Sequence, residues 1–158
     1  MVNLKTDGIT GLRKALKKKK LACFGAGKHF ETVMCLYSSY HLEQCVEYIV
    51  DNDSSIYNTF KNYQGTEYRI ISLKTFESEE DIENTVLLIT SHMYCMEIVS
   101  QLDHRESLNG MDVYIGSFLS EDTGPALPYG IGGKAAGRIP KIIHYCWFGR
   151  GEIPYEYQ

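Results

Sequence analysis

The residues best suited to chemistry are two closely spaced glycines, Gly25 and Gly27, which follow an apolar run and precede a helix-like pattern. Glycine lets a strand turn sharply into a helix, and its bare backbone lets a diphosphate approach the helix N-terminus. The free backbone N–H groups and the helix dipole favour an anion there. We therefore predict a phosphate-binding turn made of Gly25, Ala26, Gly27, Lys28 and His29.

A second polar group, Asp51 and Asn52, ends the short β-rich run 45–50. Asp51 lies about 20 residues beyond Phe30, where the dinucleotide-binding fingerprint G-x-G-x-x-G places an acid. A carboxylate there accepts hydrogen bonds from ribose hydroxyls and repels a phosphorylated ribose. Asp51, Asn52 and Asp53 also form turns readily. Both interpretations stay open, and both can hold for the same residues.

Thr90 and Ser91 lie at the end of the most hydrophobic run of the chain, residues 85–90, which is typical of a parallel strand buried on both faces. Their hydroxyls can contact a phosphate or a sugar from the wall opposite the glycine loop. Phe30 stands where the fingerprint has its third glycine, which argues against the usual close packing of helix on strand.

Strand-like runs at 20–24, 45–50, 68–72, 85–90 and 112–116 alternate with helical patterns. This alternation predicts an α/β fold: a Rossmann-like three-layer sandwich with a parallel sheet of about five strands in the order 3-2-1-4-5. In that order the first and fourth strands are neighbours, so the glycine loop and Thr90 meet at the carboxyl edge of the sheet.

Composition narrows the class of protein. The chain has 158 residues and a net charge of −4, and seven of its sixteen Lys and Arg residues lie in the first twenty positions, with a single acid among them. The acidic remainder argues against nucleic acid as a partner. Five scattered cysteines without a C-x-x-C pair favour reduced thiols and no metal site. We recognise no signal peptide or transmembrane segment, so we expect a cytoplasmic protein.

The segments 24–27, 49–53 and 88–91 resemble the small Rossmann-like domains at the N-termini of bacterial sugar-modifying enzymes, as do four single residues, Gly65, Ile70, Glu97 and Ile98. A similar domain of sugar O- and N-acetyltransferases binds a UDP-sugar. The resemblance therefore implies a nucleotide-binding-type domain over residues 1–122.

A Gly- and Pro-rich linker is expected at 123–138. The following segment, 139–154, resembles the opening strand of capsular-polysaccharide glycosyltransferases of glycosyltransferase family 32. The resemblance implies that 139–158 begin a GT-A domain, whose Asp-x-Asp motif holds a divalent metal and the sugar-nucleotide diphosphate. No Asp-x-Asp follows here, so we expect these 158 residues to be inactive alone.

Three functions follow as hypotheses. The first is a non-catalytic module that binds a nucleotide or nucleotide-sugar, with a C-terminal glycosyltransferase domain as its partner in cis. The second is a structural or interaction domain that has lost the ligand. The third, an NAD(P)-binding oxidoreductase-like domain, is weaker, because we recognise no constellation of residues for hydride transfer. The sequence leaves open whether the module forms a homodimer.

Overall fold

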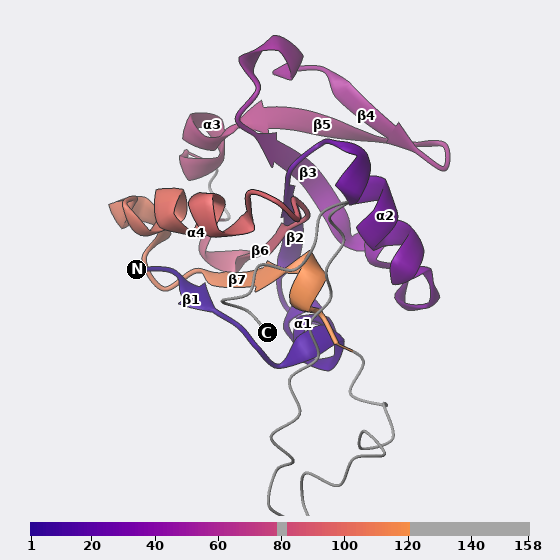
Figure 1. Ribbon diagram of the computed structural model, residues 1–158, viewed down its shortest axis with the longest axis horizontal. Helices are drawn as coiled ribbons and strands as arrows, with labels where there is room; N and C mark the ends of the chain where they lie inside the picture. The colour runs from indigo at the N-terminus through magenta and orange to yellow at the C-terminus, as the bar shows by residue number, and fades with distance from the viewer. Residues whose placement is uncertain (79–81, 121–158) are drawn as a thin grey trace, which may run out of the picture. The chain divides into compact units, whose positions relative to one another are not determined.

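The computed structural model describes residues 1–78 and 82–120 (Figure 1). The chain divides into two units, Met1–Gly124 and Pro125–Gln158. The expected linker at 123–138 and the expected start of a transferase domain at 139–158 lie outside the described residues.

The fold is α/β, with one mostly parallel sheet of seven strands in the order β1-β7-β6-β2-β3-β5-β4. The six parallel strands are β1 (Asn3–Leu4), β2 (Lys20–Phe24), β3 (Val46–Asp51), β5 (Thr66–Ser72), β6 (Thr85–Ile89) and β7 (Asp112–Ile115). Strand β4 (Phe60–Tyr63) pairs antiparallel with β5.

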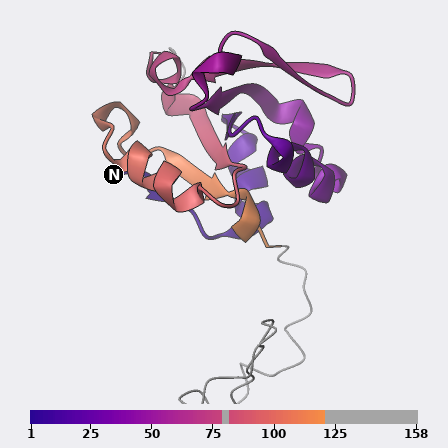
Figure 2. The same ribbon diagram turned by 45° about the horizontal axis from the view of Figure 1, so that its top comes forward.

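The prediction of about five strands in the order 3-2-1-4-5 needs a correction. The sheet has two further strands, β1 and β4, one at each edge (Figure 1). Strand β1 has only two residues, too few to show a hydrophobic period. Strand β4 has no buried residue, so it lacks the apolar alternation that marks a strand in sequence. It forms a hairpin with β5 (Figure 2), whose two turn residues, Gln64 and Gly65, both have positive φ.

Four α-helices lie among the described residues: α1 (Gly8–Leu16), α2 (Lys28–Leu36), α3 (Leu73–Glu77) and α4 (Cys95–Asp103). Helix α2 ends at Leu36. A 3₁₀ turn, Ser38–Tyr40, follows, and His41 then takes a left-handed conformation. None of the helices in the described part of the chain is long and apolar enough to cross a membrane.

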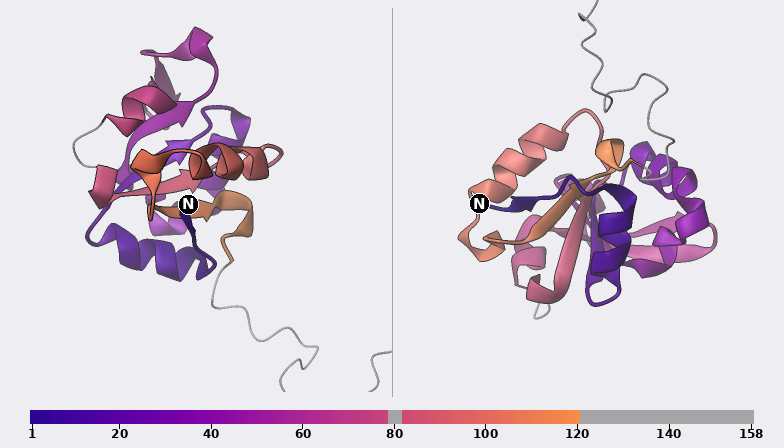
Figure 3. Two further views of the ribbon diagram at one scale, coloured as in Figure 1. Left: turned by 90° about the vertical axis from the view of Figure 1, so that its left-hand side faces the viewer. Right: turned by 90° about the horizontal axis from the view of Figure 1, so that it is seen from below.

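The helices cover both faces of the sheet (Figure 3). Side chains of β2 alternate between the faces: Leu21 and Cys23 join the core beneath α1 and α2, whereas Ala22 and Phe24 join the core beneath α3 and α4. Every residue of β6 is buried, as expected for a central parallel strand. The carboxyl ends of β2 and β6 therefore lie side by side between two helical layers.

Asp112, the first residue of β7, joins three segments at one sheet edge. Its carboxylate accepts hydrogen bonds from Lys19 Nζ at 3.0 Å and Asn3 Nδ2 at 2.8 Å, and Lys5 Nζ lies 3.4 Å away. Partial burial alone raises the pKa of Asp112. The hydrogen bond and charge of Lys19, with the charge of Lys5 and the Asn3 amide, nevertheless hold the pKa below its ordinary value of 3.8.

A lowered pKa in the folded state means that Asp112 stabilises the fold above the pKa of the unfolded chain, and that this contribution disappears as the pH falls through the folded pKa. We expect Asp112→Asn to lower the free energy of unfolding by about 0.5–1 kcal/mol at pH 6. The difference should shrink as the pH falls below 3.8. Urea unfolding of both proteins across this pH range is the measurement, and a difference that does not change with pH would contradict the assignment.

Candidate ligand-binding site

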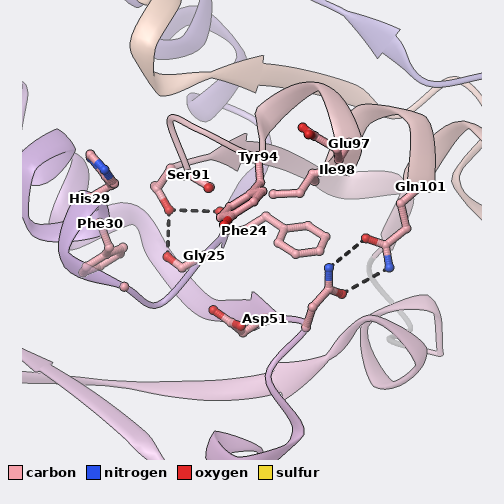
Figure 4. A pocket seen from close by; sticks show the side chains of 13 residues that line it. Phe24, Gly25, His29, Phe30, Asp51, Ser91, Tyr94, Glu97, Ile98 and Gln101 are labelled. Atoms are coloured by element: carbon pink, nitrogen blue, oxygen red, sulfur yellow. Dashed lines mark hydrogen bonds between the residues drawn. The ribbon is translucent and has the colours of Figure 1, made fainter.

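A pocket of about 500 Å³ lies at the carboxyl ends of β2, β3 and β6, between the start of α2 and helix α4 (Figure 4). This is the edge at which sheets of this class bind ligands. Seven of the predicted site residues line it: Gly25, Gly27, His29, Asp51, Asn52, Thr90 and Ser91. Ala26 and Lys28 are not among the lining residues.

Gly25 is required by the backbone itself. Its φ is +113°, a conformation that residues with a side chain rarely adopt. A Cβ atom there would lie 3.1 Å from Thr90 Oγ1 and 3.4 Å from the backbone nitrogen of Ser91. Its N–H donates to the carbonyl of Val50 at 2.8 Å, which ties the loop to the end of β3. A glycine is therefore needed at this position whether or not a ligand binds.

Gly27 differs, because the fold leaves room for a side chain. It precedes α2 as the N-cap with φ −70°, and a Cβ atom there would meet nothing within 4 Å. Because glycine has no side chain, Gly27 makes no side-chain capping hydrogen bond to the first turn of α2. No acceptor among the described residues is hydrogen-bonded to the N–H groups of Gly27, Lys28 or His29. These donors are available to an anion.

Asp51 fastens the glycine loop to the end of β3. One carboxylate oxygen accepts the N–H of Ala26 at 2.7 Å, and the other accepts the N–H of Asp53 at 2.9 Å. Asp51 thus has the turn-forming role that the sequence allowed. Each oxygen keeps a further lone pair, so the contact with a ribose stays a prediction.

Thr90 is also engaged with the backbone of the loop. It is buried, and its Oγ1 lies 3.0 Å from the carbonyl oxygen of Phe24 and 2.7 Å from that of Gly25. Its hydroxyl can donate to only one of them at a time, so it is shared between the two carbonyls. Ser91 lines the same wall, and no described residue is hydrogen-bonded to its side chain. Of the two predicted hydroxyls, Ser91 is the one free for a ligand.

Phe30 explains why a third glycine is not needed. Its side chain is fully buried and packs edge-on against Tyr68, with ring centroids 5.5 Å apart, and against Tyr63 at 6.0 Å. Helix α2 is therefore held to the sheet through an aromatic cluster. In a domain with the full fingerprint, the third glycine instead lets the backbone of the helix pack closely on the strand. Phe30 also lines the pocket.

Six lining residues were not predicted: Phe24, Phe30, Tyr94, Glu97, Ile98 and Gln101. The last four follow helical spacing along α4 and its N-cap, so they share one face of that helix. This spacing is the sequence signal that could have found them, once α4 was placed beside the glycine loop.

The two ends of the pocket differ in chemistry. In Figure 4, His29 and Phe30 lie at one end and Gln101 at the other, with the Phe24 ring between them. Asn52 and Gln101 are joined by two reciprocal hydrogen bonds: Asn52 Nδ2 donates to Gln101 Oε1 at 3.0 Å, and Gln101 Nε2 donates to Asn52 Oδ1 at 3.1 Å. This amide pair connects the end of β3 to α4.

Histidines and carboxylates complete the surroundings. The rings of His29 and His92 lie 6.0 Å apart, and His92 Nδ1 is 2.7 Å from Ser117 Oγ. Asp51 and Glu97 are the carboxylates of the lining. Within residues 1–78 and 82–120, no three His, Cys, Asp or Glu side chains are grouped so that they could hold a metal ion.

The comparisons with known proteins add no relative to this description. Models of protein families, curated proteins and solved structures were compared with the chain, and none gives a significant match. The geometry of the pocket is therefore the basis on which a function can be proposed.

Proposed function

We propose that the described domain is a Rossmann-like module that binds a nucleotide or nucleotide-sugar. The observation that carries the proposal is the pocket at the carboxyl edge of the sheet, into which a glycine loop and the uncapped start of α2 open. In this proposal the fold is a three-layer sandwich that keeps the nucleotide-binding architecture.

The strand order supports this use of the pocket. Strand β2 lies between β3 and β6 in the sheet. After β2 the chain forms β3 on one side of it, and later it forms β6 on the other side. Such a reversal leaves a crevice outside the strand ends, and this is where open α/β sheets bind ligands. Gly25 and Thr90 directly follow the two strands that flank the crevice, β2 and β6.

The size and polarity of the pocket suit a nucleotide. Small-molecule sites commonly measure about 300–1,000 Å³, mostly with apolar walls and a few directed polar groups. Here the α2 end offers backbone N–H donors and His29, whereas the opposite end offers the amides Asn52 and Gln101 beside Phe24. A nucleoside phosphate has a matching anionic end and a planar end with hydrogen-bonding edges.

The larger context is proposed from sequence resemblance alone. We propose that the module is the non-catalytic N-terminal part of a cytoplasmic glycosyltransferase in capsular or surface polysaccharide synthesis. Its partner in cis would be the transferase domain that the segment 139–154 resembles, and a divalent metal would belong to that domain.

A structural domain without a ligand is the second candidate. It is favoured by Asp51, because both of its oxygens already accept backbone N–H groups. The buried Phe30 also favours it, since this side chain takes the place of a fingerprint glycine for the sake of the core. Either residue can have this structural role while the pocket still binds a ligand, so the two candidates need a binding measurement.

The test is a ligand panel on the 158-residue chain: UDP, GDP, dTDP and ADP, their common sugar conjugates, NAD⁺ and NADP⁺. A ligand at 100 times its Kd stabilises a protein by about 2.7 kcal/mol, which raises Tm by several degrees. We expect such a shift with at least one nucleotide or nucleotide-sugar. A shift confined to NAD⁺ or NADP⁺ would favour the oxidoreductase-like alternative, and no shift at millimolar ligand would favour the structural one.

A further inference from the structure

The end of the pocket away from α2 contains an unusual pair of polar groups. Asn52 and Gln101 donate to each other across 3.0 and 3.1 Å, yet they come from different elements 49 residues apart. A primary amide has two N–H donors and two acceptor lone pairs. Each amide therefore keeps one N–H and one lone pair that the reciprocal pair does not use.

Apolar and aromatic side chains line the middle of the pocket, between this amide pair and the start of α2 (Figure 4). Phe24 and Ile98 are buried in the core and present their surfaces to the pocket. Tyr94, the N-cap of α4, is 62% exposed, and no other aromatic ring of the described residues packs against it. An exposed aromatic face in a pocket that also contains polar amides is suited to stacking a planar heterocycle.

Charge indicates which part of a ligand meets this end. The lining includes Asp51 and Glu97, and no Lys or Arg is among the lining residues that the structure describes. Asp51 is hydrogen-bonded to Ala26 in the glycine loop, so the carboxylates do not distinguish the two ends of the pocket. The free N–H groups at the start of α2 do distinguish them, because they favour a phosphate at that end. The neutral part of the ligand is therefore left for the amide end.

We propose that Asn52, Gln101 and Tyr94 form a nucleobase-recognition subsite, in which the ring stacks on Tyr94 and its polar edge hydrogen-bonds the two amides. The proposal rests on the proposed function, because it names the part of the same pocket that selects the base. Bases with a donor and an acceptor side by side, such as uracil and adenine, match what one amide presents. The alternative is that the amide pair only ties α4 to β3.

The test compares nucleotides with the same phosphoribose lacking a base. UMP, AMP, GMP and CMP are titrated by calorimetry against the 158-residue chain, alongside ribose 5-phosphate. We expect at least one nucleotide to bind more than about tenfold tighter than ribose 5-phosphate. Gln101→Leu should lower the affinity for that nucleotide about tenfold, because the hydrogen bonds to the edge of the base are lost. The affinity for ribose 5-phosphate should stay unchanged.

Two variants keep the interpretation specific. Tyr94→Phe keeps the aromatic ring, so the protein should still bind the nucleotide more tightly than ribose 5-phosphate. Tyr94→Ala removes the ring and should lower the affinity for the nucleotide about tenfold or more. Gln44→Leu changes an exposed glutamine that does not line the pocket, and it should alter the affinity for neither ligand.

The outcomes separate the two proposals. If Gln101→Leu lowers the affinities for the nucleotide and for ribose 5-phosphate equally, the Asn52–Gln101 pair only supports the pocket. That result would overturn base recognition, while the proposed function would stand. An unchanged nucleotide affinity in Gln101→Leu and Tyr94→Ala would do the same. If neither the nucleotides nor ribose 5-phosphate bind the parent chain, base recognition at this subsite is overturned, whereas the proposed function is overturned only if the panel of nucleoside diphosphates and nucleotide-sugars also gives no shift.

Discussion

Gly27→Asp is expected to abolish nucleotide binding without destabilising the fold. The position is the N-cap of α2, its backbone is extended, and a side chain there would meet nothing within 4 Å. An aspartate at an N-cap accepts hydrogen bonds from the first turn of the helix and suits the helix dipole, so stability should stay the same or rise by about 0.5 kcal/mol. The same carboxylate would occupy the N–H groups proposed for the phosphate and repel it, for an expected loss of at least about 100-fold in affinity.

Gly27→Asn is the matched control, because its side chain also caps the helix but carries no charge. It should weaken binding less than Gly27→Asp, and the difference between the two measures the effect of charge alone. Calorimetry with the tightest nucleotide of the panel, and urea unfolding of each variant, are the measurements. If Gly27→Asp binds the nucleotide as the parent does, the phosphate does not lie at the start of α2.

Gly25 cannot serve for this test, although the same loop contains it. Its φ of +113° strains any side chain, and a Cβ would press on Thr90. A substitution there would weaken the fold and the pocket together, so a loss of binding would have two causes.

Phe30→Gly, which restores the third glycine of the fingerprint, is expected to give the largest loss of stability. The side chain is fully buried and packs edge-on against Tyr63 and Tyr68. Removing a buried phenylalanine costs about 3–5 kcal/mol, and a glycine inside a helix adds up to about 1 kcal/mol. Since domains of this size are stable by about 5–15 kcal/mol, the variant should be close to unfolding.

Phe30→Leu separates volume loss from the loss of the aromatic contacts. It keeps an apolar side chain of good helix propensity, so we expect a loss of only about 1–2 kcal/mol. Urea unfolding followed by circular dichroism gives both values. A loss below about 1 kcal/mol for Phe30→Gly would mean that the helix can settle onto the sheet as in the usual fingerprint, and that the aromatic cluster contributes little.

Local sequence signals predicted the central elements of this protein. The run 86–89 is continuously apolar, and together with Thr85 it forms the fully buried strand β6. Gly25 and Gly27 lie between β2 and α2, as their spacing indicated. Both predictions succeeded because they depend on a few neighbouring residues: on hydrophobic continuity in one case, and on the backbone freedom of glycine in the other.

The edges of the sheet depended on pairing that the sequence does not display. Strand β4 has exposed and half-exposed side chains, so its extended backbone is held by hydrogen bonds to β5 and not by a buried face. Strand β1 exists because two residues pair with the start of β7, more than 100 residues later. Neither strand leaves an apolar period from which it could be predicted.

The functional site shows the same division. From the sequence alone, Asp51 was a strand-end acid and Asn52 a turn residue, with no partner specified for either. Only the tertiary structure decided that Asp51 accepts the N–H of Ala26, that Asn52 pairs with Gln101, and that Phe30 belongs to an aromatic cluster. These contacts join segments distant along the chain, and they are set by strand order and by the helix face turned toward the crevice. Residue type and spacing determine what chemistry is available, whereas packing determines which groups remain free to perform it.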